Sequence, residues 1–230
     1  MKKSLPLLAI VLLSFIAYFA LKPTPTDSKP DVKLPWDITT HADGRSEVFG
    51  LTLEQTTLAE TLQLLGEDHE LAVIANQDNY SALEVYYSHF ASGPLKGKLI
   101  IVIDAPQQAL MEIQDNPAAS TYMASGARRF SLSPQDLDRA QLWPIKSLSF
   151  IPATNLEAEI FQKRFGTPAD IVAESETTQH LLYPQLGLDI VVNAEAKEQL
   201  IYVAPRAFQT LQTPLQELIN KTVTDNTVTP

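Results

Sequence analysis

Four histidines, scattered along 230 residues, are the side chains best suited to acid–base or metal chemistry. The stretch GEDHE at 66–70 places His69 among acidic residues, a composition that metal ions favour. A zinc ion needs three or four converging ligands, however, and adjacent residues of a turn point in different directions. His89 has no serine or carboxylate at a spacing typical of a catalytic triad, and a partly buried structural role fits it better. Asp104 ends an apolar strand, where a position at the rim of a sheet explains it. We therefore predict no metal site and no catalytic residue.

Known catalytic motifs are absent from the sequence. It contains no G-x-S-x-G, S-x-x-K, H-E-x-x-H, G-x-G-x-x-G or P-loop pattern. It also contains no cysteine, which excludes disulfides, thiol catalysis, cysteine-ligated zinc and a lipidated cysteine. The sequence thus predicts a protein that is not an enzyme and that carries no cofactor.

Binding is the role that a small set of aromatic and basic residues favours. Arg128 and Arg129 form a basic pair in an acidic body, and Tyr122 lies close to them in the sequence. Aromatic residues and arginine are the usual energetic anchors of protein interfaces. Tyr86 alternates with the inward residues of a predicted strand, so it faces outward if one side of the sheet is open. We predict that these four residues bind a partner; surface ion pairs for the arginines and core packing for Tyr86 are the alternatives.

The net charge of the chain indicates which class of partner it does not bind. The 27 acidic and 17 basic residues give a net charge of −10. Proteins that bind nucleic acids carry a basic patch that neutralises phosphates. We therefore expect no nucleic-acid partner.

A hydrophobic content of 45% predicts a packed core.

The N-terminus resembles an export signal, with two lysines followed by an apolar run over residues 5–21. A run of this length is at the lower limit for crossing the bilayer. Cleavage after Ala17 or Ala20 would place a bulky aromatic residue at the −3 position, so we predict an uncleaved anchor in residues 1–21. By the positive-inside rule the protein is then a single-pass inner-membrane protein with its body in the periplasm; cleavage and release into the periplasm is the alternative. Residues 22–35 carry four prolines and predict a semi-rigid linker.

Two passages of the body share one pattern. Thr57 with Glu60, and Thr154 with Glu157, form T-x-x-E boxes that predict the start of a helix. Each predicted helix ends at a glycine, Gly66 or Gly166. We expect Gly66 to adopt the left-handed conformation. Strands are predicted after the two helices and before each of them, and they are listed here in chain order: 46–53, 70–75, 83–90, 98–106, 145–152, 170–174, 180–183, 187–193 and 199–205. We interpret the two passages as a duplicated unit, with coincidence as the alternative.

The sequences TLAETLQLLGEDHEL and LEAEIFQKRFGTPADIV, each followed by predicted antiparallel strands, carry a resemblance. They resemble the helix–glycine–meander repeat of the β-lactamase-inhibitor-protein superfamily, which includes the BamE-like (SmpA/OmlA) lipoproteins. The chain as a whole is similar to proteobacterial envelope proteins. It departs from the family in lacking the lipobox cysteine and in having Glu67 and Asp68 after Gly66. The resemblance implies an α+β fold and a protein-binding role, and it implies no active site.

These observations predict an α+β protein: an N-terminal membrane helix, then a duplicated unit of one helix and an antiparallel β-meander. The predicted domains are 1–21, the anchor; 22–35, the linker; 36–106, the first unit; 107–147, a helical insert; 148–212, the second unit; and 213–230, a polar tail. The predicted function is a non-catalytic binding or scaffold module of the bacterial envelope, attached to the inner membrane by residues 5–21 and bound to another envelope protein. Two alternatives are a carrier of a lipid or small apolar ligand, and an envelope hydrolase that uses His89 or Asp104.

Overall fold

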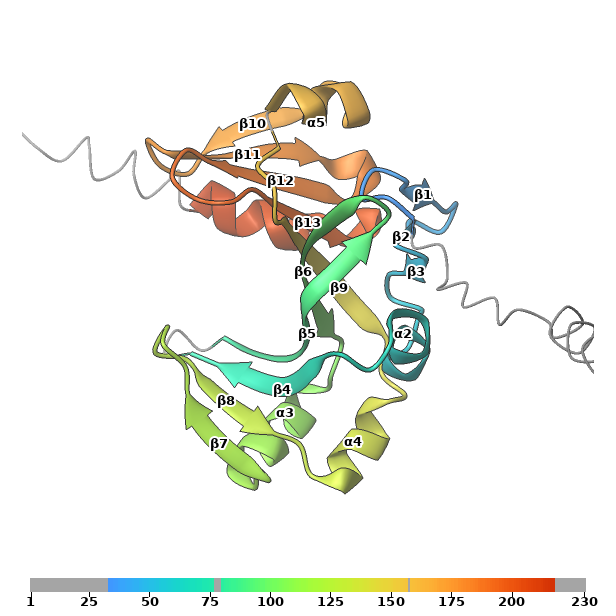
Figure 1. Ribbon diagram of the computed structural model, residues 1–230, viewed down its shortest axis with the longest axis vertical. Helices are drawn as coiled ribbons and strands as arrows, with labels where there is room; N and C mark the ends of the chain where they lie inside the picture. Colours follow the sequence, from blue (N-terminus) through green and yellow to red (C-terminus); the bar gives the residue numbers. More distant parts are fainter. Residues whose placement is uncertain (1–32, 77–79, 157, 218–230) are drawn as a thin grey trace, which may run out of the picture. The chain divides into compact units, whose positions relative to one another are not determined.

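A ten-stranded antiparallel sheet dominates the structure, which is a computed structural model (Figure 1). It describes residues 33–76, 80–156 and 158–217. The strands of this sheet, in chain order, are β4 (Glu70–Ala75), β5 (Ser81–Ser92), β6 (Leu95–Ile103), β7 (Ala119–Tyr122), β8 (Arg128–Ser131), β9 (Ile145–Pro152), β10 (Asp170–Ala173), β11 (Thr178–Tyr183), β12 (Leu188–Asn193) and β13 (Gln199–Val203). Their order across the sheet is β10-β11-β12-β13-β9-β6-β5-β4-β8-β7.

The predicted α+β fold of two separate units is therefore wrong, because the described part of the chain is mostly β, with 41% of it in strands. The difference between the expected and the observed fold arises from β9, the strand that was expected only to lead into the second unit. It pairs with β6 along one edge and with β13 along the other. Since both edges of β9 are hydrogen-bonded, the two meanders become one continuous sheet.

Alternation along these strands gives the sheet two faces. One row of directly paired residues runs through Tyr86, Ile100, Ser149 and Ile201, and we call the face that carries them the open face. Along each strand, the residues that alternate with these point to the opposite face, which we call the core face. There the main hydrophobic cluster gathers, and Phe150 on β9 is fully buried in it.

A small second sheet supplies part of the core. It is three-stranded and contains β1 (Thr39–Thr40), β2 (Ser46–Val48) and β3 (Leu51–Thr52). The single strand predicted over 46–53 is in fact a hairpin, because Phe49 and Gly50 both have positive φ, of 56° and 79°. Two such residues form the tight turn that matches the twist of a β-hairpin. The turn buries the ring of Phe49 edge-on against Phe90, Phe150 and Tyr202.

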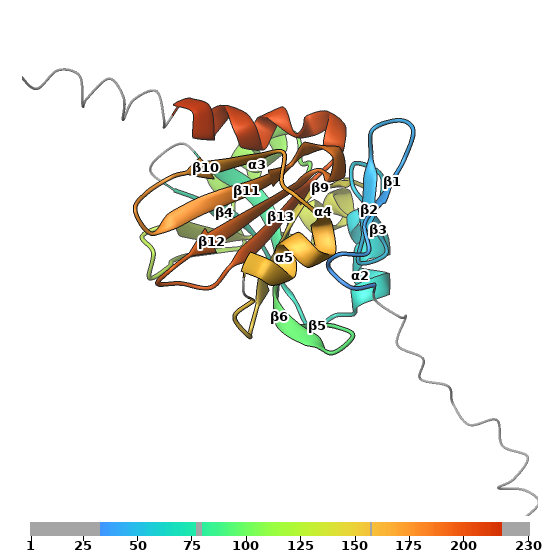
Figure 2. The same ribbon diagram turned by 90° about the horizontal axis from the view of Figure 1, so that it is seen from above.

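Helices cover the sheet on both faces (Figure 2). They are α2 (Leu58–Leu65), α3 (Gln107–Asp115), α4 (Pro134–Ala140) and α5 (Ala158–Phe165), with short 3-10 turns at η1 (Pro184–Leu186) and η2 (Pro205–Ala207). Residues 209–217 are also helical. The helix over 209–217 and α5 lie on opposite sides of β10–β13 in Figure 2. Leu215 of this helix belongs to one hydrophobic cluster with Val172, Leu182 and Val203, so the helix covers part of the open face.

The helix-start signal at Thr57 acts as the sequence predicts. The Thr57 side chain accepts a hydrogen bond from the Glu60 amide, and the Glu60 carboxylate accepts one from the Thr57 amide, which completes the capping box at α2. Ser133 caps α4 in the same way through the Asp136 amide. Gly66 ends α2 with φ 90° and ψ 178°, so its backbone is extended rather than in the expected left-handed helical region. A positive φ with extended ψ is open almost only to glycine. Glu157, the partner in the second predicted box, lies outside the described residues.

The two helix-ending glycines share a tertiary contact that the sequence did not suggest. The Tyr87 hydroxyl on β5 donates a hydrogen bond to the Gly66 carbonyl at 3.0 Å. The Tyr183 hydroxyl on β11 donates one to the Gly166 carbonyl at 3.1 Å. Each bond fixes the end of a helix to the second strand that follows it.

We expect Tyr87→Phe to lower the free energy of unfolding by about 1 kcal/mol, because it removes the donor and leaves the Gly66 carbonyl without this partner. Urea denaturation of the full-length protein measures the loss. Tyr122→Phe is the matched control, since its side chain is 77% exposed. Equal stability of the two variants would show that the bond to Gly66 contributes nothing.

The parts outside the two meanders also differ from expectation. The insert over 107–147 contains α3 and α4, but its β7–β8 hairpin extends the large sheet, because β8 pairs with β4. Residues 33–35, at the end of the predicted linker, lie against the body: the Tyr202 hydroxyl donates a hydrogen bond to the Pro35 carbonyl at 3.0 Å. Residues 213–217, at the start of the predicted tail, are helical.

The predicted anchor, residues 1–21, and most of the predicted linker lie outside the described residues. Within residues 33–217, with the gaps given above, no helix combines the length and the apolar character needed to span a bilayer.

Candidate functional site

The structure brings two of the four predicted binding residues together and places the other two elsewhere. Tyr86 on β5 and Arg129 on β8 line one pocket on the open face. Arg128 and Tyr122 pair directly across β7 and β8, and both belong to the opposite face. The predicted site is therefore two separate pairs, one on each side of the sheet.

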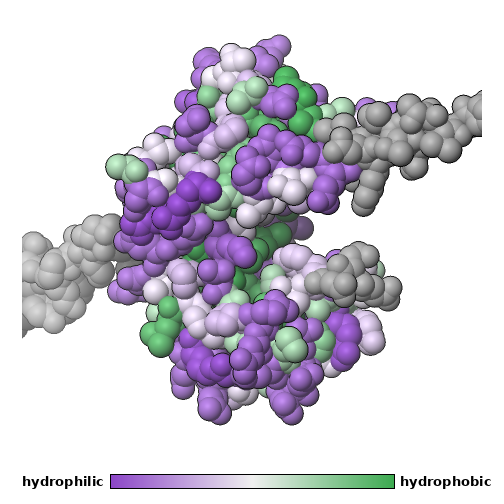
Figure 3. Space-filling model, turned by 180° about the vertical axis from the view of Figure 1, so that it is seen from behind, coloured by the Kyte–Doolittle hydropathy of each residue, from purple (hydrophilic) through white to green (hydrophobic). Residues whose placement is uncertain are grey.

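The pocket that holds Tyr86 and Arg129 has a volume of about 310 Å³, and we call it the Tyr86 pocket. Alternate residues of β4, β5 and β6 form most of it, together with one residue each from β8 and the β7–β8 loop. Its lining residues are Glu70, Ala72, Ile74, Glu84, Tyr86, Ile100, Met123 and Arg129. Viewed from behind, the surface is hollowed at mid-height, with hydrophobic side chains at the floor of the hollow (Figure 3).

The charged groups of the Tyr86 pocket differ in how they are compensated. Arg129 forms an ion pair with Glu70, whose side chain is 55% exposed. Glu84 has Ala72 and Val102 as its direct cross-strand neighbours, and the Tyr80 hydroxyl donates a hydrogen bond to it at 2.7 Å. Burial raises the pKa of the Glu84 carboxyl, and the bond from Tyr80 only partly opposes this effect. The pocket thus offers an apolar floor, one aromatic ring and carboxylates at its wall.

The second pair of predicted residues has a structural explanation. The Arg128 guanidinium lies 5.3 Å from the centre of the Tyr122 ring and 4.7 Å from that of Phe130. It also donates a hydrogen bond to Ser120 at 3.1 Å. These contacts order the exposed β7–β8 hairpin. Of the surface ion pairs expected as the alternative role of the two arginines, the described residues show one, between Arg129 and Glu70.

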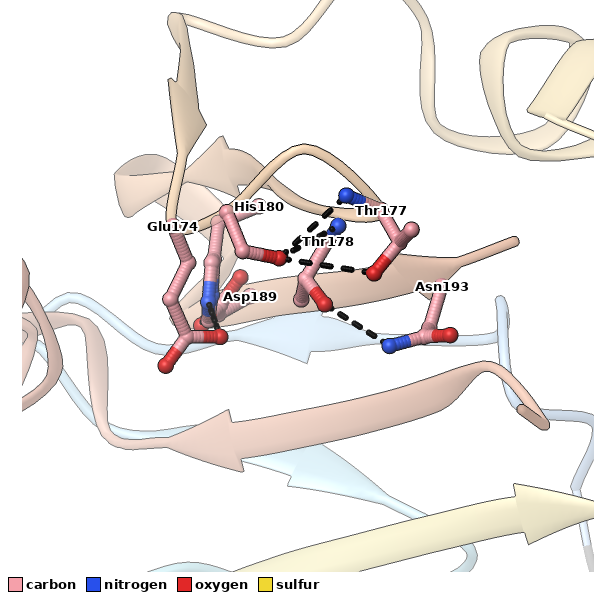
Figure 4. Close-up of polar contacts among 7 residues, drawn as sticks. Glu174, Thr177, Thr178, His180, Asp189 and Asn193 are labelled. Atoms are coloured by element: carbon pink, nitrogen blue, oxygen red, sulfur yellow. Dashed lines mark hydrogen bonds and ion pairs between the residues drawn. The ribbon is translucent and has the colours of Figure 1, made fainter. Parts of the chain in front are cut away.

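A polar cluster on β11 and β12, which sequence reasoning missed, surrounds His180 (Figure 4). His180 Nδ1 lies 2.7 Å from Asp189 Oδ2, and both side chains are buried. His180 Nε2 lies 3.4 Å from Glu174 Oε2. The second oxygen of Asp189, Oδ1, is buried and has no hydrogen-bond partner among the described residues. A lone aspartate inside the apolar run GLDIVV, across a hairpin from a histidine, was the signal that could have revealed the pair.

The pKa of His180 reflects two opposing effects. Burial lowers it, while the hydrogen bond and the charge of Asp189, followed by those of Glu174, raise it, and the net result is a raised pKa. Both ring nitrogens face carboxylates, so neither faces a hydroxyl that it could activate as a nucleophile. Ser175, the nearest hydroxyl in sequence to Glu174, accepts hydrogen bonds from the amides of Thr177 and Thr178. This arrangement is suited to stabilising a charged histidine rather than to general base catalysis.

The remaining sequence candidates lie apart from both clusters. His89 is exposed rather than partly buried, because a bulge in β5 between Tyr87 and Phe90 takes it off the core face. Its Nδ1 lies 2.8 Å from the Ser88 hydroxyl. Asp104 is exposed after β6, at 3.7 Å from the ammonium of Lys146. Within the described part of the chain, no three histidine or acidic side chains are grouped closely enough to hold a metal ion.

Comparisons of this chain with models of protein families, with curated proteins and with solved structures found no match.

Proposed function

We propose that this protein is a non-catalytic binding module of the bacterial envelope and that its partner, another envelope protein, contacts the Tyr86 pocket. Residues 5–21 attach it to the inner membrane, and the body acts in the periplasm. The observation that carries the proposal is the position of Tyr86 and Arg129 in one pocket of the open face. Aromatic rings and arginine beside an apolar floor are the usual composition of an interface hot spot.

The size of the pocket favours a side chain of a protein over a larger ligand. A volume of about 310 Å³ is at the lower end of small-molecule pockets, which span roughly 300–1,000 Å³. Such a space accommodates one aromatic or long aliphatic side chain. The partner would then lay a surface segment across β4, β5 and β6, with this side chain on Ala72, Ile74 and Ile100.

Photocrosslinking in living cells tests the proposal on the full-length protein. A benzophenone amino acid replaces Ile100, at the floor of the pocket, and the captured protein is identified by mass spectrometry. The matched control replaces Ile171, which is 53% exposed on the edge strand β10. We expect one protein to be captured from position 100 and not from position 171, and we expect Tyr86→Ala to reduce that capture about tenfold or more, as for a hot-spot residue.

Two results would contradict this function. One is equal capture from positions 100 and 171, which indicates non-specific contact. The other is no capture from position 100 in a protein that is abundant and folded. A captured protein is accepted as the partner only if it also binds the purified full-length chain and loses this binding with Tyr86→Ala.

A further inference from the structure

A second pocket lies on the open face beside the β5–β6 hairpin, and it shares no lining residue with the Tyr86 pocket. Its volume is about 640 Å³. Ala91, Ile151 and Ala153 form its apolar lining, and we call it the lysine pocket because Lys96, Lys98 and Lys197 also line it.

The local structure explains why the three lysines converge. Lys96 and Lys98 are two residues apart on β6, so their side chains point to the same face. Gly97 between them lies against the core: a Cβ there would come within 2.6 Å of the Phe150 ring. Lys197 reaches the pocket from the loop between β12 and β13, where it donates a hydrogen bond to Asn155.

No described carboxylate compensates the charge of the lysine pocket. Among the described residues no acidic side chain lines it, and none of its lysines forms an ion pair. This concentration of positive charge stands out in a chain with a net charge of −10. Neighbouring like charges repel one another, so an anion placed between them is stabilised. His89 also lines the pocket.

We infer that the lysine pocket binds an anionic amphiphile, with its phosphate or carboxylate head on Lys96 and Lys98 and its apolar chain on Ala91, Ile151 and Ala153. Both halves of the ligand are needed to match the pocket. A free phosphate ion would leave the apolar lining exposed to water, and a neutral hydrocarbon would leave the lysines without a counter-charge. This site is separate from the Tyr86 pocket and does not depend on the function proposed for it.

Binding of short-chain probes to the full-length protein, reconstituted in nanodiscs of zwitterionic phosphatidylcholine, tests the inference. Labelling of isoleucine δ1-methyl groups with ¹³C places a reporter on Ile151, opposite Lys98, whose resonance is assigned with Ile151→Val. The probes are hexyl phosphate, hexanoate, hexanol, inorganic phosphate and a hexaglutamate peptide. We expect hexyl phosphate or hexanoate to shift this resonance saturably, and hexanol and inorganic phosphate to bind at least about tenfold more weakly, because charge-assisted bonds and the buried chain each contribute to affinity.

Matched variants test whether Lys96 and Lys98 bind the charged head of the probe. Lys96→Gln with Lys98→Gln is expected to weaken binding of the charged probe about tenfold and to leave hexanol unchanged. Lys146→Gln with Lys163→Gln, on exposed lysines elsewhere, is expected to change neither. The stronger of the two charged probes identifies the head group as phosphate or carboxylate. The inference is overturned if hexanol binds as tightly as the charged probes, or if the Lys96 and Lys98 variant binds normally. Binding of hexaglutamate alone would also overturn it and would assign the lysines to an acidic protein segment.

Discussion

His180→Leu is expected to lower the free energy of unfolding by about 3–5 kcal/mol, which is a large part of the total stability of a typical domain. The substitution removes the only group hydrogen-bonded to the Asp189 carboxylate among the described residues. Asp189 is 2% exposed and sits directly between Leu182 and Ile201 in the sheet. An ionised carboxylate there, without its histidine, keeps the full cost of its lost hydration. Urea denaturation of the full-length protein measures the change.

The double variant His180→Leu with Asp189→Leu is the control that separates a lost charge pair from a damaged fold. Replacing both members of a buried pair by apolar residues of similar size is often neutral or stabilising. We therefore expect the double variant to recover most of the stability lost in His180→Leu. If it is as unstable as the single variant, packing around His180, and not the unpaired carboxylate, explains the loss.

The same pair makes the stability depend on pH. The pKa of His180 is raised in the folded protein, so its contribution is fully present below the pKa of an unfolded histidine, about 6.5. That contribution is lost as the pH rises through the higher pKa of the folded state. We expect the free energy of unfolding to fall from pH 6 to pH 9 in the wild type by more than in the double leucine variant. Equal slopes in the two proteins would contradict a raised pKa.

Phe150→Ala is expected to cost about 3–5 kcal/mol as well, for a different reason. Phe150 is fully buried on β9, the strand that joins the two halves of the sheet. Its ring lies 5.7 Å from that of Phe49 and 5.9 Å from that of Phe90, in edge-on geometry. Alanine leaves a cavity where the small sheet and the large sheet meet, and the rigid β-strands around it cannot close the space. Urea denaturation again gives the change in the free energy of unfolding.

Two further variants serve as controls for Phe150→Ala. Phe150→Leu keeps most of the volume and is expected to cost less than half as much as Phe150→Ala. Leu142→Ala, on a side chain that is 77% exposed, is expected to change stability by less than about 0.5 kcal/mol. If Phe150→Ala is no worse than Leu142→Ala, the aromatic cluster does not stabilise the junction of the two sheets.

The candidate site was only partly predictable. Alternation along 83–90 correctly separates Tyr86 from Val85 and Tyr87, because the side-chain period of a strand is two residues. The partnership of Tyr86 with Arg129 was not predictable, since it depends on β8 pairing with β4 across more than fifty residues of chain. Glu84 and the lysine pocket were missed for the same reason: a charge in a strand is ordinary until its cross-strand neighbours are known.

The sequence by itself determined the local structure of this protein. The helix start at Thr57 follows from a capping side chain, and the extents of β4 and β9 follow from apolar patterns that act over a few residues. Only the tertiary structure decided that β9 pairs along both edges, which turned two expected units into one sheet. It also decided which charges are buried together, as for His180 and Asp189. Backbone hydrogen bonds between strands carry no side-chain identity, so a strand's sequence predicts that it will pair but not with which partner.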